Sequence, residues 1–273
     1  MSDFSIAFIG AGNMASSIIG GLVAGGHPAG TIRAADISTE SLERLASVAP
    51  VSTGTDNAAA AEGADVIILA VKPQVLAGVC ASIAPVIAKQ DALILTVAAG
   101  VPIASYQRWL QTRAPVVRCM PNTPSLLGCG ASGLFASPEV SATQRERAQA
   151  IMEAVGTSVW VEREEQLHAV TALSGSGPAH FFLFMESMVD AGERLGLNRD
   201  SAATLVHQTC LGAARMAMES GDTLEELRRR VTSPGGTTER SIASFEAQSL
   251  RDVVHNALVE CSTRSRELSD ELG

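Results

Sequence analysis

The stretch FSIAFIGAGNMASSII (residues 4–19) decides the fold of this chain. Its first part, Phe4–Ile9, is short, apolar and partly β-branched, as is typical of a buried strand. A glycine pattern, G-x-G-x-x-A, follows at once and opens a stretch of helical character that runs from Asn13 to about Ala24. A glycine turn between a strand and a helix predicts a dinucleotide-binding loop, because the glycines let backbone N–H groups approach the pyrophosphate.

Strand-like and helical segments alternate beyond this turn. Near-continuous apolar runs such as DVIILAV (Asp65–Val71) are typical of parallel strands that are buried on both faces. The alternation predicts an α/β fold with a doubly wound parallel sheet. The other predicted strands are Thr31–Asp36, Ala92–Ala98 and Val116–Met120, and the next predicted helices are Ser41–Val48 and Val75–Ala88.

The pattern changes after about Trp160, where strand-like runs end and long helical stretches follow. We place a domain boundary near Val161–Glu164, which predicts a dinucleotide-binding domain of residues 1–162 and an all-helical domain of residues 163–273. The stretch PAHFFLFMESMVDAGERLG is apolar on more than one face, so we expect a second subunit to cover part of it. The expected helices are Pro178–Leu195, Arg199–Glu219, Thr238–Gln248 and Leu250–Leu272.

Composition and charge exclude several classes of function. The formal net charge of −9 argues against nucleic acid and anionic membranes as partners. The five cysteines are scattered and no Cys/His cluster has the spacing of a metal site, so we expect reduced thiols and no metal. No apolar run is long enough to span a membrane, and the N-terminus lacks the pattern of a signal peptide. We therefore expect a cytoplasmic protein.

Asp36 ends the second predicted strand, where an acidic residue usually accepts hydrogen bonds from the adenosine ribose. Its negative charge would also repel the 2′-phosphate of NADPH, so we expect a preference for NADH. Two alternatives stay open at this point. Asp36 could instead cap the next turn, and Ser38, Thr39 and Arg33 could accommodate a 2′-phosphate.

Four other segments carry polar residues where chemistry is expected. AVKPQ (Ala70–Gln74) and MPNTP (Met120–Pro124) each follow a predicted strand, at the edge of the sheet where ligands bind. SGSGPAH (Ser174–His180) begins the predicted long helix of the second domain. SPGGTT (Ser233–Thr238) places two glycines before two threonines at a predicted helix start, a nest of N–H groups that suits a small carboxylate.

Taken in order, GAGNMA, VKP, MPNTP, SGSGPA and SPGGTT resemble the pyrroline-5-carboxylate reductase family over the whole chain. The resemblance implies a Rossmann-type domain followed by an all-α dimerisation domain that interlocks with a second subunit. The active site would lie between the two domains at the dimer interface, and rings of dimers also occur in the family. The implied reaction is reduction of a cyclic imino acid, 1-pyrroline-5-carboxylate, to L-proline by NADPH or NADH.

The resemblance also implies roles for single residues. Thr238 would donate a hydrogen bond, or relay a proton, to the ring nitrogen of the substrate. His180 stands where tyrosine is common and Arg230 replaces an asparagine of some relatives, so details of the pocket differ. The residues implied at the substrate are Glu164, Thr171, Ser174, Ser233, Gly236, Thr237 and Thr238. The residues expected at the cofactor are Gly10, Ala11, Gly12, Asn13, Met14, Asp36, Asn57, Ala70, Val71, Lys72, Pro73, Ala98, Ala99 and Asn122.

Two other functions are compatible with a dinucleotide fold. A β-hydroxyacid dehydrogenase needs a lysine in the helix between its domains to handle the alcohol proton. The corresponding stretch, roughly Glu164–Leu173, contains His168 but no lysine, and no lysine follows Lys89. A non-catalytic protein that senses NAD(H) would need no carboxylate nest, so SPGGTT argues against it.

Overall fold

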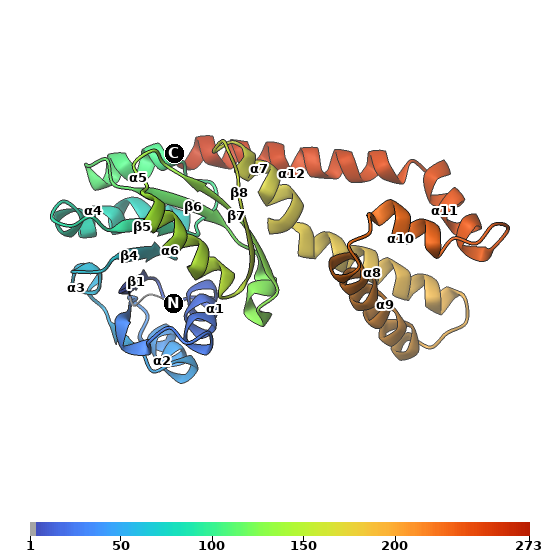
Figure 1. Ribbon diagram of the computed structural model, residues 1–273, viewed down its shortest axis with the longest axis horizontal. Helices are drawn as coiled ribbons and strands as arrows, with labels where there is room; N and C mark the ends of the chain where they lie inside the picture. The colour runs from blue at the N-terminus through green and yellow to red at the C-terminus, as the bar shows by residue number, and fades with distance from the viewer. Residues whose placement is uncertain (1–3) are drawn as a thin grey trace. The chain divides into compact units, whose positions relative to one another are not determined.

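The computed structural model describes residues 4–273, and the chain divides into two compact units. The first unit runs to Ser176 and also includes Cys261–Gly273, while the second unit comprises Gly177–Glu260. The first unit carries the sheet, and the second is built from helices alone (Figure 1).

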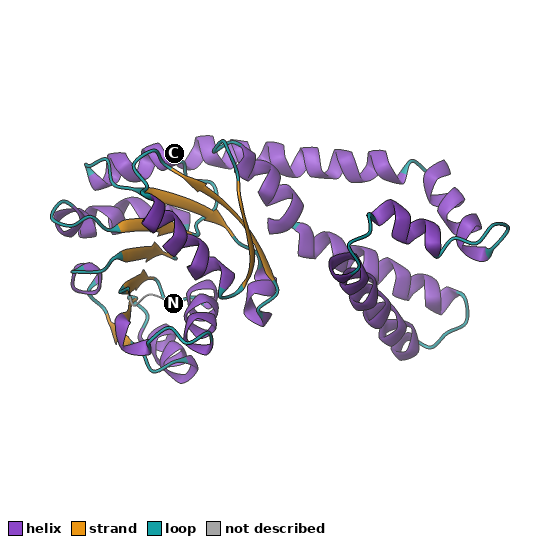
Figure 2. Ribbon diagram, in the orientation of Figure 1, coloured by secondary structure: helices purple, strands orange, loops and turns teal. Residues whose placement is uncertain are grey.

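An eight-stranded sheet forms the centre of the first unit, in the order β3-β2-β1-β4-β5-β6-β7-β8. Strands β3 to β6 are mutually parallel, β7 runs antiparallel to β6, and β8 is parallel to β7 (Figure 2). The strand order reverses at β1, which pairs with β2 on one side and β4 on the other. The strands are β1 (Ile6–Ile9), β2 (Ile32–Ala35), β3 (Ser52–Gly54), β4 (Val66–Leu69), β5 (Leu93–Thr96), β6 (Val116–Met120), β7 (Gly130–Ala136) and β8 (Gly156–Trp160).

The central strands are buried on both faces because successive side chains enter different cores. In β1, Ile6 and Phe8 belong to one core, and Ala7 and Ile9 belong to the other. Helices α1 (Asn13–Ala24), α2 (Thr39–Val48) and α6 (Ala142–Glu153) cover the first core. Helices α3 (Asn57–Ala61), α4 (Leu76–Ile87) and α5 (Ile103–Leu110) cover the second. The predicted doubly wound fold is therefore confirmed.

Strands β3, β7 and β8 were not expected from the sequence. The segment GASGLFA of β7 is rich in small residues that have low strand propensity in isolation. Glycine is required there, because a Cβ on Gly156 would lie 2.0 Å from the carbonyl oxygen of Gly130 on the neighbouring strand. The close pairing of β7 with β8 is thus a tertiary feature that no run of apolar residues announces.

The division into units differs from the boundary expected near residues 161–164. Helix α7 (Gln166–Val170) and the π-helical turn η4 (Thr171–Gly175) belong to the first unit. A Cβ on Gly133 of β7 would lie 2.6 Å from Val170, so α7 packs directly on the sheet. The end of α12 (Leu250–Leu272) joins the same unit, where the side chain of Leu272 packs against the second core.

The second unit is a small helical assembly with little core of its own. Its buried apolar residues are Val189, Ala202 and Val206, at the contact between α8 (Gly177–Arg194) and α9 (Arg199–Glu219). Helices α10 (Leu224–Arg230), α11 (Thr237–Ala247) and the first part of α12 complete it. Many large apolar side chains of this unit are exposed, including Phe181, Phe182, Leu183, Phe184, Leu205, Leu211, Met216, Met218, Val253 and Val254.

The described part of the chain has neither a membrane-spanning helix nor a cluster of metal-binding side chains. Among residues 4–273, no helix combines the length and the apolar character needed to cross a membrane. In the same range, no group of three or more His, Cys, Asp or Glu side chains could hold a metal ion. All five cysteines are free thiols, and burial raises the pKa of Cys80 and of Cys119 to about 12.

Candidate dinucleotide site and carboxylate loop

The glycine turn between β1 and α1 has the backbone that a dinucleotide loop needs. Gly10 has a φ of +105°, and a Cβ there would lie 2.5 Å from the carbonyl oxygen of Ala70, so only glycine fits. Gly12 caps α1 without a side chain, and the space beside it is open. The start of α1 therefore offers N–H donors and the positive end of the helix dipole to a phosphate. Asn13 and Met14 form its first turn.

Asp36 lies directly after β2 and holds the glycine turn in place. Its Oδ2 accepts a hydrogen bond from the N–H of Ala11 at 2.7 Å, and its Oδ1 accepts one from the N–H of Ser38 at 2.8 Å. The carboxylate thus caps the turn that follows β2, which was one of the two alternatives, and it also contacts the glycine turn at Ala11. Its contact with the ribose stays a prediction.

The segment AVKPQ lies beside the glycine turn because β4 pairs with β1. The side chain of Val71 reaches within 2.9 Å of the position that a Cβ on Gly10 would take. Lys72 is exposed and precedes the short helix η2 (Pro73–Val75). The structure therefore brings Ala70 and Val71 against the nucleotide loop and leaves the ammonium group of Lys72 in solvent.

Ala98 and Ala99 follow β5, the next strand of the sheet. The N–H of Ala98 donates to Thr96 Oγ1 at 3.3 Å, and Thr96 Oγ1 lies 2.7 Å from the hydroxyl of Tyr106 in a buried hydrogen bond. Burial raises the pKa of Tyr106, so this phenol stays protonated. Neither residue belongs to a motif, so this pair could not be predicted from the sequence. Asn57 is placed at the start of α3, where its amide is 3.5 Å from Ser82 Oγ.

Asn122 lies directly after β6 and has both ends of its amide engaged. Its Nδ2 donates to the carbonyl oxygen of Ser174 at 3.0 Å, and its Oδ1 accepts the N–H of Ala131 at 2.9 Å. Gly10, Ala70, Ala98 and Asn122 thus follow four neighbouring parallel strands at one edge of the sheet. This is the edge where ligands bind in open α/β sheets.

Thr171 and Ser174 lie on the π-helical turn η4. Their hydroxyls donate to backbone carbonyls one turn earlier, Thr171 to Leu167 at 2.8 Å and Ser174 to Val170 at 3.0 Å. Single π-helical turns inside longer helices occur often at functional sites. Both hydroxyl oxygens keep acceptor capacity for a ligand.

Glu164 is engaged by protein groups within the first unit. Its Oε1 accepts a hydrogen bond from the guanidinium of Arg118 at 2.6 Å and another from the N–H of Ile103 at 2.8 Å. The side chain of Arg118 is only 7% exposed, which makes this a largely buried ion pair. A lone arginine within the otherwise apolar strand VVRCM is the sequence feature that could have indicated this ion pair. A substrate contact of Glu164 stays a prediction.

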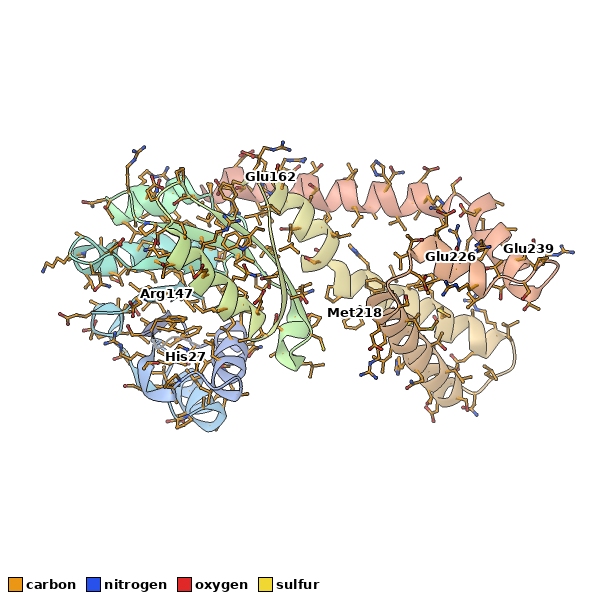
Figure 3. The ribbon with its side chains drawn as sticks, viewed as in Figure 1. His27, Arg147, Glu162, Met218, Glu226 and Glu239 are labelled. Atoms are coloured by element: carbon orange, nitrogen blue, oxygen red, sulfur yellow. The ribbon has the colours of Figure 1, made fainter. Side chains whose placement is uncertain are left out.

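SPGGTT forms the loop before α11 in the second unit. Gly235 has a φ of +72°, which favours glycine, and its N–H donates to the carboxylate of Glu239 at 2.7 Å. Gly236 caps α11 and brings no capping side chain to the N–H groups of Thr237 and Thr238. Glu239, which the sequence analysis did not single out, is labelled near the start of α11 in Figure 3. The loop therefore already binds one carboxylate, from its own helix.

The two departures from the family pattern lie in the second unit. Arg230 makes a bidentate contact with Asp222, at 2.5 and 3.0 Å, and also approaches Glu226 at 3.4 Å. It therefore fastens α10 to the turn that precedes it. The side chain of His180 is exposed on the first turn of α8.

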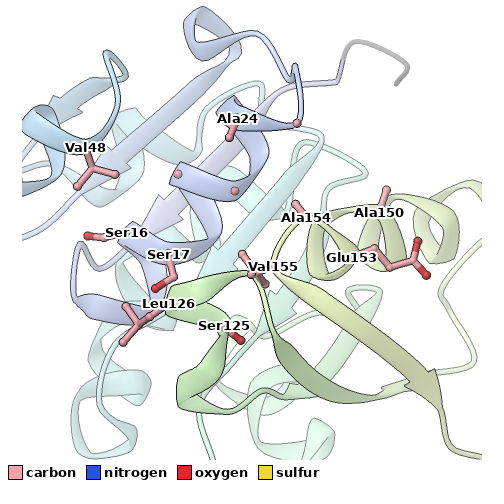
Figure 4. Close-up of a pocket in the computed structure, with 14 residues that line it drawn as sticks. Ser16, Ser17, Ala24, Val48, Ser125, Leu126, Ala150, Glu153, Ala154 and Val155 are labelled. Carbon is pink, nitrogen blue, oxygen red and sulfur yellow. The ribbon is translucent and has the colours of Figure 1, made fainter. Parts of the chain in front are cut away.

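A separate cavity of about 850 Å³ lies in the first unit (Figure 4). It is lined by α1, by the short helix η3 (Thr123–Leu127) and by the end of α6. Ser16 and Ser125 contribute hydroxyls, while Leu126 and Val155 contribute apolar surface. None of the residues predicted at the cofactor or substrate lines this cavity.

Comparison with known proteins gives consistent matches. The family model described as pyrroline-5-carboxylate reductase dimerisation matches residues 164–268, and the model described as NADP oxidoreductase coenzyme F420-dependent matches residues 5–100. A pyrroline-5-carboxylate reductase of Pseudomonas aeruginosa is 53% identical over the full length of both chains. The structure of a pyrroline-5-carboxylate reductase from Coxiella burnetii has a TM-score of 0.96 at 42% identity, covering 98% of this chain and 99% of that one. A pyrroline carboxylate reductase of Plasmodium falciparum, with NADP bound, has a TM-score of 0.84 at 27% identity, covering 98% and 99%.

Proposed function

This chain belongs to the pyrroline-5-carboxylate reductase family, and from that membership we propose that it reduces the C=N bond of 1-pyrroline-5-carboxylate to form L-proline. The reaction is the last step of proline biosynthesis. A nicotinamide cofactor supplies the hydride when it is bound. The structural observation that carries the proposal is a contact in the SPGGTT loop. The N–H of Gly235 there already donates a hydrogen bond to a carboxylate.

The first unit is suited to hold the cofactor by its pyrophosphate. Gly10 and Gly12 leave room for the phosphates, and the N-terminus of α1 favours their negative charge. We propose that Ala70, Val71, Ala98 and Ala99 line the rest of the cofactor, because they follow the strands next to β1 at the same edge. Each residue then acts by positioning, which is the main requirement for hydride transfer.

The second unit is suited to hold the substrate carboxylate. In the proposed complex, the substrate carboxylate takes the N–H donors of Thr237 and Thr238, and Gly236 and the hydroxyl of Ser233 lie beside them. The N–H of Gly236 itself donates to the carbonyl oxygen of Ser233 at 2.9 Å. Hydrogen bonds from such groups to an ionised carboxylate contribute about 1.5–3 kcal/mol each. The existing contact of Glu239 with Gly235 supports this assignment, since a backbone N–H of the loop donates there to a carboxylate.

Protonation of the ring nitrogen does not require a strong general acid from the protein. A cyclic imine is basic enough to be partly protonated near neutral pH, and the protonated form accepts hydride readily. We propose that the hydroxyl of Thr238 hydrogen-bonds to the ring nitrogen and holds the ring in place: it donates to the neutral imine and accepts from the N–H of the protonated one. A threonine hydroxyl is a weak acid, so its main contribution is orientation.

The alternative reaction, oxidation of a β-hydroxyacid, requires a catalytic lysine that this chain does not have at the expected place. Helix α7 and turn η4 contain no lysine. His168 lies there, but its Nδ1 is 2.9 Å from Ser265 Oγ and the side chain is buried, which gives it a structural role. The imine reaction needs no such base.

The choice between the two nicotinamide cofactors depends on Asp36 in our proposal. Its carboxylate lies at the end of β2, held by backbone N–H groups and available to the ribose hydroxyls. A 2′-phosphate in the same place would meet a negative charge, so we propose that NADH is preferred. NADPH would be accepted more weakly.

The exposed apolar side chains of α8 support a role for this unit in self-association. Phe181, Phe182 and Leu183 are each more than 60% exposed on consecutive positions, so apolar surface surrounds the helix. A patch of this extent favours burial by another subunit. We propose an interlocked dimer in which α8 of each subunit is covered by its partner, and rings of such dimers as the larger assembly. The five free thiols support our expectation of a reducing, cytoplasmic compartment.

The direct test is to mix the protein with 1-pyrroline-5-carboxylate and either NADH or NADPH, and to follow the absorbance of the reduced cofactor. We expect turnover with both and a larger kcat/KM for NADH. Cofactor binding without turnover in either case would refute the reductase and leave a sensor. A larger kcat/KM for NADPH would refute only the proposed preference.

A further inference from the structure

Asn122 connects three parts of the first unit through one amide side chain. It follows β6, accepts the N–H of Ala131 on β7, and donates to the carbonyl oxygen of Ser174 on the π-helical turn η4. The residue is only 8% exposed, so these two bonds are shielded from water. Both ends of the amide are therefore occupied by the protein's own backbone.

The sequence explains why the carbonyl of Ser174 takes its hydrogen bond from Asn122. In a continuing α-helix it would accept from the N–H four residues later, but that residue is Pro178, which has no N–H. This carbonyl is partly buried, where a missing hydrogen-bond partner costs free energy. The amide of Asn122 supplies the missing hydrogen bond from outside the helix.

The turn η4 also packs closely on the end of β6. A Cβ on Gly175 would lie 2.5 Å from the terminal methyl group of Met120. The N–H of Ser176 donates to the carbonyl oxygen of Thr171, five residues earlier, at 2.8 Å. Together with the amide bond of Asn122, these contacts fix the turn that carries the hydroxyls of Thr171 and Ser174.

We infer that Asn122 is a positioning residue of this enzyme, which holds the η4 turn on the sheet rather than contacting the cofactor with its own amide. The inference deepens the proposed function, on which its kinetic consequences rest. Without Asn122 the turn loses its anchor to β7, and the two hydroxyls predicted at the substrate lose their fixed place.

The sharpest variant is Asn122→Asp. Its ionised carboxylate still accepts the N–H of Ala131 but has no hydrogen to donate to Ser174, and it places a negative charge beside that carbonyl. Burial raises the pKa of such a carboxyl, and the protonated form regains a donor. The matched control is Asn122→Ala, which removes both bonds and introduces no titrating group.

We expect kcat/KM for 1-pyrroline-5-carboxylate to fall about tenfold or more in both variants at about pH 8. We divide the kcat/KM of each variant by that of the wild type at the same pH. This ratio should rise for Asn122→Asp as the pH falls to about 6, whereas it should stay low at every pH for Asn122→Ala. The Kd of the cofactor, measured by fluorescence, should change less than about twofold. A loss of cofactor affinity that accounts for the loss of activity would overturn the inference in favour of direct cofactor contact, and so would an unchanged kcat/KM in Asn122→Ala.

A second measurement does not depend on activity. Amide hydrogen exchange should become about tenfold faster in a peptide covering residues 166–177 of Asn122→Ala, while a peptide from α6 should exchange as in the wild type. Equal exchange of residues 166–177 in both proteins would overturn the inference. If the wild type fails to reduce 1-pyrroline-5-carboxylate, the proposed function is refuted, and the exchange experiment still decides whether Asn122 anchors the turn.

Discussion

Asp36 stabilises two turns of the fold and is also the residue that we propose to select the cofactor. Its two oxygens accept the N–H groups of Ala11 and Ser38, and the same carboxylate is our candidate for ribose recognition. Replacing it therefore has two effects, a looser glycine turn and the loss of a negative charge near the 2′-position. Only the second effect distinguishes the two cofactors.

For Asp36→Ser we expect the ratio of kcat/KM for NADPH to that for NADH to rise about tenfold, because the charge repulsion of a 2′-phosphate is removed. The KM of both cofactors should rise as the glycine turn loosens. Steady-state kinetics with each cofactor measures both effects. Ser38→Ala is the control, since it keeps the charge, and an unchanged ratio in Asp36→Ser would show that Asp36 does not read the ribose.

Thr238 offers a test of whether the SPGGTT loop binds the substrate. In Thr238→Ala we expect kcat to fall about 10- to 100-fold, since a hydrogen bond from the N–H of the charged ring to the hydroxyl oxygen contributes about 1.5–3 kcal/mol. The Kd of the cofactor, measured by fluorescence, should stay nearly unchanged. Thr238→Ser keeps the hydroxyl and should retain most of the activity. Equal losses of turnover and cofactor affinity in Thr238→Ala would mean that the loop is only structural.

His168 makes the stability of the first unit depend on pH. Burial and the nearby charges of Arg118 and Arg266 hold its pKa below the ordinary 6.5. As the pH falls below that value the unfolded chain takes up the proton first, so stability that is present at neutral pH is lost in acid. We expect Tm to drop more in the wild type than in His168→Gln between about pH 7.5 and pH 5.5. Parallel curves in thermal denaturation would contradict this.

At the scale of elements, the ion pair of Arg118 and Glu164 joins β6, the start of α5 and the segment before α7. Removing one partner of a buried pair leaves the other charge without compensation, which costs about 3–5 kcal/mol. We expect Glu164→Ala to lower Tm strongly at a fixed protein concentration. The control Glu162→Ala removes an exposed carboxylate two residues earlier (Figure 3) and should leave Tm nearly unchanged. If Glu164→Ala keeps its Tm but raises the KM of the substrate, Glu164 acts mainly as a substrate ligand.

Elements with strong patterns were predictable, and elements built by contact were not. The strands β1, β4, β5 and β6 and the helix α1 were predicted close to their observed bounds, because near-continuous apolar runs and the glycine turn are local signals. Strands β7 and β8 went unseen, because small residues at Gly130 and Gly156 serve a close backbone approach that only the paired strands reveal. The packing of α7 on the sheet could not be predicted either, because it depends on the close approach of Val170 to Gly133.

At the scale of the whole molecule, the second unit does not bury its own apolar surface. The side chain of Phe182 is 63% exposed, and its neighbours on α8 are similar. We expect Phe182→Glu to shift the protein from dimer or larger assembly towards monomer in size-exclusion chromatography with light scattering, because a charge cannot be buried in such an interface. Val48→Glu, at an exposed position of α2, is the control. An unchanged mass would exclude this face of α8 from the interface.

The sequence by itself determined the fold class, the glycine turn between the first strand and helix, and the family of this protein. These depend on local spacing, such as the glycines between a strand and a helix, and on motifs that occur in a fixed order. Only the tertiary structure decided what single polar groups do. Glu164 meets Arg118, Asn122 meets Ser174, and Glu239 meets the N–H of Gly235. The first two pairs join residues far apart in the chain, and the third depends on the positive φ of Gly235, so their hydrogen bonds exist only once the backbone has folded.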